Sequence, residues 1–312
     1  MKNLAWTVSD MGDQHDRTVL ITGANSGLGL ASALAFAQSG ARVLLACRSP
    51  ERGGAALEQV RAVATGNAPQ LIELDLADLA SVKQASEQVG EVASSLDVLM
   101  NNAGVMALPL RRTAQGHEMQ FGTNHLGHFA LTARLLPLLL AAPDARVVTT
   151  SSGAHRLGKM RWQDLDWHSG YQKWAAYGQS KLANLMFCFE LQRQAVAAKV
   201  KLSSLAAHPG YASTHLQAAG PELSGQALMG RFMDVANSVF AQSAEQGALP
   251  QLFAATSSEA VGGCYYGPSG LGEMRGAPRL VQTTSSALKR DEWARLWSVS
   301  SELTELSFDW PN

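Results

Sequence analysis

The stretch Thr18–Gly29, TVLITGANSGLG, decides the fold class. Its first residues are β-branched or aliphatic, which is typical of a buried strand in a parallel sheet. Gly23, Gly27 and Gly29 follow directly, and the chain then has the composition of a helix up to Gln38. A strand that enters a helix through a glycine-rich turn suits phosphate binding, because free N–H groups and the positive dipole end of the helix face the turn. The alternative is a tight turn that binds no ligand.

Strands and helices alternate along the chain that follows. We expect further strands at 41–47, 70–76, 96–104, 145–152, 200–210 and 262–267, and helices at 28–38, 50–64, 81–94, 114–140, 174–197, 244–255 and 288–303. This order predicts an α/β fold: a Rossmann-type, doubly wound parallel sheet of about seven strands with helices on both faces. Such sheets bind ligands at the carboxyl ends of their strands, so the loops after the strands should hold the functional residues.

Length and composition favour one large domain. The chain has 312 residues, of which 46% are hydrophobic and 16% charged, and this composition excludes an intrinsically disordered protein. We expect a single domain over 17–312, preceded by a polar surface extension at 1–16. The segment 211–240 is rich in Ser, Gly, Ala and Met, and it interrupts the alternation. We expect it to be a mobile loop beside the substrate.

Charge, cysteines and hydropathy exclude several classes of protein. A net charge of -1 argues against nucleic-acid binding. Three cysteines without CxxC spacing argue against disulfides and zinc clusters, and they favour a reducing, cytoplasmic location. The apolar run at 131–142 contains Arg134 and Pro137 and is shorter than the ~20 residues of a membrane span. The N-terminus lacks the apolar core of a signal peptide. We expect no metal site, because no third ligand accompanies His125 and His128.

A tyrosine and a lysine are spaced to share one helix face. Tyr177 and Lys181 in YGQSK lie four residues apart, close to one helical turn. A cation beside a phenol lowers the pKa of the phenol from its usual value of ~10, and this produces an acid or base that works near neutral pH. Taken alone, the spacing also fits an ordinary surface pair.

Other polar residues follow the predicted strands or lie close to them. Ser151 and Ser152 end one strand, and the sequence NNAG at 101–104 ends another. Asn124 lies on the predicted helix 114–140. Pro209 and Gly210 follow a third strand, with Thr214 shortly after them; all these residues are placed for the same edge of the sheet.

Together these motifs resemble those of the short-chain dehydrogenase/reductase family. The resemblance extends from Arg17 to about Gly267 and includes, in order, TGxxxGxG, DL, NNAG, NxxGHF, SS, YxxxK and PGxxxT. ACRSPERG, SSGAH and YGQSKLAN are most similar to the retinol-dehydrogenase-like subgroup, which includes the oxidoreductase domain of a WW-domain protein. The resemblance implies an oxidoreductase that interconverts a carbonyl and an alcohol on a small or medium lipophilic substrate, using NADP(H) or NAD(H).

The resemblance also implies a catalytic role for four residues. Tyr177 would donate the proton to the carbonyl oxygen, and Ser152 would polarise that oxygen, with Ser151 as the rival serine. Lys181 would lower the pKa of Tyr177 and bind the nicotinamide ribose. Asn124 would bend its helix and hold a water molecule that relays protons.

The remaining implied residues bind the dinucleotide. They are the turn residues Gly23, Asn25, Ser26, Gly27, Leu28 and Gly29, the adenine neighbours Asp75 and Leu76, the ribose neighbours Asn102, Ala103 and Gly104, and the carboxamide neighbours Pro209, Gly210 and Thr214. Tyr177 and Lys181 contact the cofactor as well.

The second strand favours NADP(H) as the cofactor. An NAD enzyme places a carboxylate there for the ribose 2′-hydroxyl, whereas this chain has Cys47 followed by Arg48, which suits a 2′-phosphate. Arg52 is a second candidate cation. Ser26 stands where many NADP-preferring relatives carry a basic residue, so NAD(H) stays as the alternative.

Three other functions compete with the enzyme. A non-catalytic NADP-binding regulator has no need for an intact set of Asn124, Ser152, Tyr177 and Lys181. Protochlorophyllide reductases carry a cysteine where this chain has Ala183, and the short N-terminal extension with one tryptophan holds no WW adaptor module. We expect a small-molecule substrate as the partner and allow for a homo-oligomer, since relatives often associate through two long helices.

Overall fold

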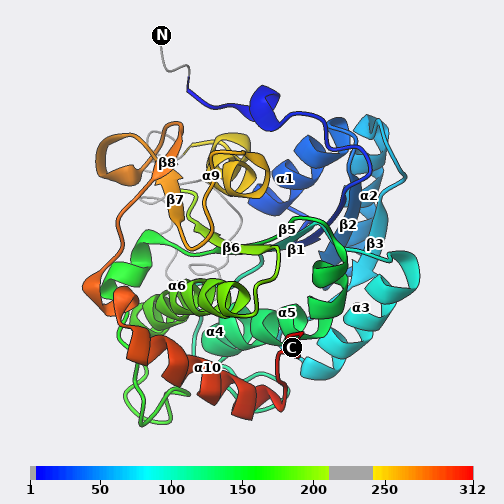
Figure 1. Ribbon diagram of the computed structural model, residues 1–312. Helices are drawn as coiled ribbons and strands as arrows, with labels where there is room; N and C mark the ends of the chain where they lie inside the picture. The colour runs from blue at the N-terminus through cyan, green and yellow to red at the C-terminus, as the bar shows by residue number, and fades with distance from the viewer. Residues whose placement is uncertain (1–4, 211–241, 312) are drawn as a thin grey trace, which may run out of the picture.

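The computed structural model describes residues 5–210 and 242–311 and contains an eight-stranded sheet (Figure 1). The strands lie in the order β3-β2-β1-β4-β5-β6-β7-β8. The bounds are β1 Thr18–Thr22, β2 Arg42–Cys47, β3 Gln70–Glu73, β4 Val98–Asn101, β5 Ala145–Thr150, β6 Leu202–Ala207, β7 Tyr265–Pro268 and β8 Pro278–Leu280. The order reverses beside β1, where β2 and β4 both pair with it in parallel. This reversal is the place where a doubly wound sheet binds ligands.

Helices cover both faces of the sheet, as the alternation predicts (Figure 1). One face packs against α1 (Gly27–Gln38), α2 (Pro50–Val63) and α9 (Ala244–Thr256). The other packs against α3 (Leu79–Val92), α5 (Gly127–Ala141) and α6 (Lys173–Ala197). The central strands β1, β2 and β4 are buried on both sides, which explains why they are nearly continuous apolar runs without alternation.

Two elements differ from the prediction. The short strand β8 pairs antiparallel with β7 at the edge of the sheet, and three residues are too few to give a hydrophobic period. The helix predicted over 114–140 begins at Met119, because Gly116 has φ +88° and turns the chain. Glu118 then caps the helix by accepting a hydrogen bond from the Phe121 N–H. The helix consists of α4 (Met119–Phe121), a π-helical turn (Gly122–Leu126) and α5.

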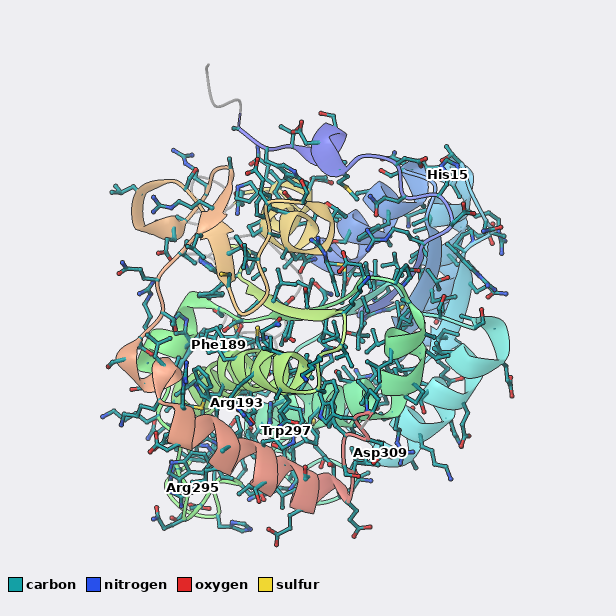
Figure 2. All side chains as sticks on the ribbon, in the orientation of Figure 1. His15, Phe189, Arg193, Arg295, Trp297 and Asp309 are labelled. Carbon is teal, nitrogen blue, oxygen red and sulfur yellow. The ribbon has the colours of Figure 1, made fainter. Side chains whose placement is uncertain are left out.

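The C-terminal segment covers the outer face of α5 and α6. Helix α10 (Arg290–Thr304) lies along α6, and Figure 2 shows Trp297 on its inner side. The Trp297 ring stacks on Phe187 with 5.8 Å between ring centroids, and it meets Phe308 at 4.4 Å. The two long helices α5 and α6 are therefore packed against the C-terminal segment of the same chain.

The N-terminal extension packs on the domain from residue 5 onward. Trp6 meets Phe253 of α9 edge to face at 5.5 Å, and Met11 is 3% exposed. The polar composition of residues 1–16 does not predict these two apolar contacts.

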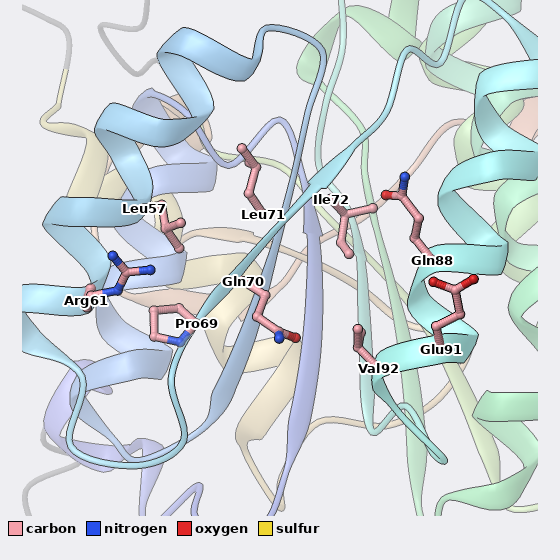
Figure 3. A pocket seen from close by; sticks show the side chains of 9 residues that line it. All are labelled: Leu57, Arg61, Pro69, Gln70, Leu71, Ile72, Gln88, Glu91 and Val92. Carbon is pink, nitrogen blue, oxygen red and sulfur yellow. The ribbon is translucent and has the colours of Figure 1, made fainter.

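A surface hollow of about 360 Å³ lies at the β3 edge, between α2 and α3 (Figure 3). Its lining includes Arg61, Gln70 and Glu91 but none of the candidate site residues. Within the described residues, no helix is long and apolar enough to cross a membrane.

Candidate active site

The described candidate residues gather at the carboxyl edge of the sheet. Gly23–Gly29 follow β1, Asn102–Gly104 follow β4, Ser152 follows β5, and Pro209 with Gly210 follow β6. These strands are neighbours or near neighbours in the sheet, so their loops converge. Thr214 and the expected mobile loop at 211–240 lie outside the described residues.

The glycine turn packs tightly at the start of α1. Gly23 has φ +67°, and a Cβ on it would approach the Ala103 Cβ to 3.0 Å. A Cβ on Gly29 would overlap the Gly23 carbonyl oxygen. Ser26 is the N-cap residue of α1, yet its side chain accepts no hydrogen bond from the first turn, and that turn carries no acidic residue. The N–H groups at this helix end are therefore available to an anionic ligand.

Thr22 joins the glycine turn to the NNAG turn. Its Oγ1 accepts hydrogen bonds from the backbone N–H groups of Asn102 and Ala103, both at 2.9 Å. Asn102 Nδ2 donates back to the Thr22 carbonyl at 2.8 Å. The Asn102 Oδ1 atom is buried without a hydrogen-bond partner among the described residues and can accept one from a ligand.

His128 connects Thr22 to the π-helical turn. Its Nε2 lies 2.9 Å from Thr22 Oγ1, and its Nδ1 lies 3.0 Å from the Asn124 carbonyl. A carbonyl only accepts, so Nδ1 carries the hydrogen. Burial lowers the pKa of His128 to about 4, which keeps the ring neutral at pH 7. The sequence alone favours packing or hydrogen bonding for this histidine over metal binding, and the link to Thr22 becomes visible only in the fold.

Asn124 occupies the middle of the π-helical turn and is fully buried. Its side chain accepts from the Val105 N–H at 2.8 Å and donates to the Val105 carbonyl and to Ser180 Oγ, both at 2.9 Å. π-Helical turns inside α-helices often mark functional sites. The wider turn brings the Asn124 amide onto the loop after β4, where it faces Gly104.

Tyr177 and Lys181 lie on one face of α6, as the spacing predicts. They are 5% and 3% exposed, and Lys181 Nζ lies 5.7 Å from the centroid of the Tyr177 ring. The ammonium donates to the Thr150 carbonyl at 3.1 Å. A Cβ on Gly104 would lie 3.4 Å from Lys181 Nζ and 3.1 Å from Asn124 Oδ1, so these three residues meet at one point.

Burial controls the charges of this pair. It raises the pKa of Tyr177 to about 12, against a lowering hydrogen bond with Ser152. It also lowers the pKa of Lys181 to about 8. Removal from water dominates the pKa of Tyr177 in the protein without cofactor, and the lowering of this pKa by Lys181 stays a prediction. Tyr177 is a protonated phenol at pH 7, as a proton donor must be.

The two serines after β5 have different surroundings. Ser151 is buried, and its hydroxyl donates to the Lys181 carbonyl at 2.8 Å, which fixes α6 to the sheet. Ser152 is half-buried and accepts from the Ala154 N–H at 3.2 Å. The Ser152 hydroxyl therefore keeps its own hydrogen to donate, and it is the serine that faces Tyr177.

The residues after β2 lie beside the glycine turn. Cys47 is 2% exposed, and burial raises the pKa of its thiol to about 11 despite hydrogen bonds from the Ala24 and Asn25 backbone. The position is therefore uncharged. Arg48 is exposed, and Ser49 caps the start of α2 by accepting from the Arg52 N–H at 3.3 Å.

Asp75 and Leu76 form the turn after β3. Asp75 Oδ1 accepts from the Ala77 N–H at 2.9 Å, and this bond holds the turn in place. Leu76 is 6% exposed and packs on α5, where a Cβ on Gly127 would approach the Leu76 Cβ to 3.0 Å. Both residues lie on the β2–β3 side of the glycine turn, away from Tyr177.

Gly210 closes the turn after β6 with φ +70°. A Cβ there would meet the Pro268 ring at 2.8 Å and the Met274 carbonyl even closer, so this position requires glycine. The Pro209 carbonyl accepts a hydrogen bond from Gln242 Nε2.

The long segment between Ser152 and Tyr177 packs against the loop after β4. The Tyr171 hydroxyl donates to the Leu108 carbonyl at 2.8 Å, and Asp166 Oδ1 accepts from the Glu118 N–H at 2.9 Å. Trp162 Nε1 donates to Glu292 of α10 at 2.7 Å. The segment thus ties three parts of the chain together beside the site.

The described residues contain no His, Cys, Asp and Glu cluster of metal-binding size. His125 Nε2 instead pairs with Ser300 Oγ at 2.8 Å, so the two histidines on this helix serve hydrogen bonding.

Comparison with known proteins agrees with this geometry. The family model for short chain dehydrogenases matches residues 17–222. Retinol dehydrogenase 14 of Mus musculus is 39% identical over 83% of this chain and 79% of its own length. A crystal structure of an uncharacterized protein from Mycobacterium paratuberculosis is 40% identical, with a TM-score of 0.81 over 98% of this chain and all of that one.

A second solved structure is described as a complex with NADPH. It is a short chain dehydrogenase from Escherichia coli CFT073, 27% identical, with a TM-score of 0.56 over 67% of this chain and 83% of that one. The sheet order and the Tyr–Lys helix define a dinucleotide-fold oxidoreductase. This chain belongs to the short-chain dehydrogenase/reductase family, and it is an enzyme that acts on a carbonyl or an alcohol.

Proposed function

We propose that this protein is an NADP(H)-dependent carbonyl reductase or alcohol dehydrogenase for a small or medium lipophilic substrate, with Tyr177 as its proton donor. The single observation that carries the proposal is the meeting of Tyr177, Lys181, Asn124 and Ser152 at the carboxyl edge of the sheet. Binding of a dinucleotide alone needs no buried, protonated tyrosine there. This distinguishes the enzyme from a non-catalytic regulator on the same fold.

The residues present fit a dinucleotide. The uncapped N–H groups at the start of α1 suit its pyrophosphate. The absence of side chains at Gly23 and Gly29 lets this turn pack closely against Ala103 and against itself, which holds the turn in place. The buried Asn102 Oδ1, which has no partner in the described part of the chain, suits a ribose hydroxyl. When bound, the nicotinamide supplies or accepts the hydride. Lys181, Pro209 and Gly210 would hold its ribose and carboxamide end, and Thr214 belongs to the same proposal.

The surroundings of Cys47 favour NADP(H) over NAD(H). A neutral, buried thiol is a much weaker hydrogen-bond acceptor for a ribose 2′-hydroxyl than a carboxylate, and the exposed Arg48 guanidinium beside it suits a phosphate. Arg52 is close enough to Cys47 to affect its pKa, which makes it the second candidate cation. The related dehydrogenase described with NADPH points the same way.

The protein's own groups perform the proton chemistry. Tyr177 donates its phenolic proton to the substrate oxygen, since its pKa of about 12 keeps it protonated until charge develops on that oxygen. Ser152 donates a hydrogen bond to the same oxygen. The Lys181 ammonium, below its pKa of about 8, stabilises the tyrosinate that forms. Asn124 holds the loop after β4 against Lys181 and keeps one lone pair of Oδ1 for a proton-relaying water.

The rim of the site favours an apolar substrate. Trp174 is 49% exposed and lies one turn before Tyr177, with their rings 6.2 Å apart. Leu110 in the segment after β4 and Leu157 in the 3₁₀ turn after Ser152 are 44% and 73% exposed, and both add apolar surface to segments that follow site strands. The relatives named retinol dehydrogenases make retinal a natural member of any test panel.

The compartment and the partners are part of the same proposal. Cys47, Cys188 and Cys264 are free thiols, which suits a cytoplasmic location. The partner would be the small-molecule substrate. Residues 17–312 would act as one domain. A homo-oligomer that associated through α6 would meet α10, which lies along this helix.

A carbonyl panel tests the proposal. Aldehydes and ketones, retinal included, are offered with NADPH or NADH, and cofactor oxidation is followed by absorbance. We expect turnover of at least one apolar carbonyl with NADPH, and loss of that turnover in Tyr177→Phe. A folded protein that binds NADPH tightly but turns over none of the panel would favour the non-catalytic regulator instead.

A further inference from the structure

Three buried aromatic rings lie behind the site, and the mechanism above uses none of them. Tyr265 of β7 contacts the rings of His155 and His208, whose centroids lie 5.5 Å and 5.2 Å from its own. The three residues are 2%, 1% and 3% exposed, in that order. His155 follows Ser152 by three residues, and His208 directly precedes the Pro209–Gly210 turn.

His155 holds the backbone of Ser152. Its Nδ1 lies 2.6 Å from the Ser152 carbonyl oxygen. A carbonyl only accepts, so Nδ1 carries the hydrogen and Nε2 does not. Ser152 is the N-cap residue of the 3₁₀ turn Gly153–Leu157, and its carbonyl also accepts from the His155 backbone N–H at 3.0 Å. The preceding residue, Ser151, is held by the hydrogen bond from its N–H to the Ala207 carbonyl. The direction of the Ser152 hydroxyl therefore depends on His155.

His208 holds the turn after β6 through the opposite tautomer. The Gly210 N–H donates to His208 Nδ1 at 3.2 Å, so the hydrogen of this ring is on Nε2. That Nε2 lies 3.3 Å from Glu273 Oε2. Glu273 also pairs with Arg156 at 2.9 Å, which links the turn after Ser152 to the loop after β7.

Both rings keep one tautomer at neutral pH. Burial lowers the pKa of His155 and lowers that of His208 to about 4. The charged groups that face them are Arg156 and Glu273, and these pair with each other. Each ring thus offers its neighbour a fixed hydrogen-bonding pattern: a donor to Ser152 and an acceptor to Gly210.

We propose that His155 and His208 are positioning residues with separate tasks, His155 for the substrate-facing serine and His208 for the turn that binds the nicotinamide end of the cofactor. Neither ring touches the reacting atoms, and each acts through a backbone group. Tyr265 packs against both rings. The inference rests on the proposed function, because the two tasks are defined by its substrate and its cofactor.

Substitutions of His155 test the first task. His155→Phe keeps a ring but removes the donor, whereas His155→Asn puts an amide N–H at the position of Nδ1. We expect kcat to fall about tenfold in the phenylalanine variant, the value of one lost hydrogen bond, with the NADPH Kd unchanged. The asparagine variant should recover most of the loss. In a Ser152→Ala background, His155→Phe should cause no further fall in kcat, because its effect passes through Ser152.

Substitutions of His208 test the second task by fluorescence titration of NADPH, which needs no turnover. We expect His208→Phe to reduce the affinity for NADPH by up to about tenfold. His208→Asn, whose Oδ1 replaces the lost acceptor, should restore that affinity. His15→Ala is the matched control, since this exposed histidine lies beyond α1 and should change neither value (Figure 2).

Several results would overturn the proposal. One is an equal fall in kcat from His155→Phe with and without the Ser152 hydroxyl. Another is a pair of His155 and His208 variants that change the same quantity. If His155→Phe fails to fold, His155→Gln serves in its place: its longer side chain moves the donor away from the Ser152 carbonyl, so wild-type kcat in it would refute the first task. Full turnover by Tyr177→Phe would refute the proposed function instead, while the NADPH titrations would still judge His208.

Discussion

Cofactor preference should reverse when the residues after β2 are exchanged. The variant Cys47→Asp with Arg48→Ile removes the cation proposed for the 2′-phosphate and adds a carboxylate. The introduced carboxylate would lie where the backbone N–H groups of Ala24 and Asn25 already meet the thiol, so the new charge has hydrogen-bond donors beside it. It would accept a hydrogen bond from a ribose hydroxyl and repel a phosphate.

The magnitude follows from one charge-assisted interaction. Such a hydrogen bond contributes about 1.5–3 kcal/mol, which corresponds to a roughly 10- to 150-fold change in affinity. We expect NADPH to bind more weakly by at least that factor, because repulsion by the introduced carboxylate adds to the lost bond. NADH should bind more tightly. Arg61→Ile is the matched control: Arg61 is exposed on the same helix, α2, but lines the hollow at the β3 edge (Figure 3).

The assay is the ratio of kcat/KM for NADPH to kcat/KM for NADH, measured in the wild type, the double variant and the Arg61 control. The account requires a ratio above one in the wild type and a fall of at least tenfold in the double variant. A wild-type ratio below one would refute the NADP(H) preference. A ratio that Cys47→Asp with Arg48→Ile leaves unchanged would show that Arg48 does not carry it.

Two further predictions concern α6 and its neighbours. Burial lowers the pKa of Lys181 to about 8, so the rate of carbonyl reduction should be constant near pH 7 and fall as the pH rises through 8. Lys181→Met should be slow at every pH and should lack this inflection. A wild-type rate that stays constant to about pH 10, near the unperturbed pKa of lysine, would contradict the role of the ammonium. Trp297→Ala removes a ring packed on Phe187 and Phe308, so thermal or urea unfolding should show a loss of about 3 kcal/mol. The exposed Val196→Ala should lose less than about 0.5 kcal/mol, and equal losses would contradict the packing of α10 on α6.

The sequence predicts the order of elements well, because short apolar runs that end in turn residues mark the buried strands and longer segments between them mark the helices. Its failures have local causes. Gly116 lies near the start of the helix predicted over 114–140, and only its φ of +88° shows that the chain turns there before the helix begins. The strand β8 is three residues long and pairs at the edge, so it leaves no pattern in the sequence.

The sequence predicts which residues meet at the site, but it does not predict their burial or their contacts with distant parts of the chain. The Tyr177–Lys181 spacing places both side chains on one face, yet their pKa values depend on burial, which the spacing does not contain. The Thr22–His128 link and the rings around Tyr265 join residues that are distant in the sequence. Such contacts between elements appear only once the strands are paired.

The most direct test of the account is the effect of Tyr177→Phe on a carbonyl that the wild type reduces with NADPH. The change removes the phenolic proton and keeps the ring beside Trp174. General acid catalysis is worth roughly 10²–10⁴-fold, so the account predicts that kcat falls by at least a hundredfold while the NADPH Kd changes less than about twofold. A folded Tyr177→Phe protein that keeps more than a tenth of the wild-type kcat would contradict it.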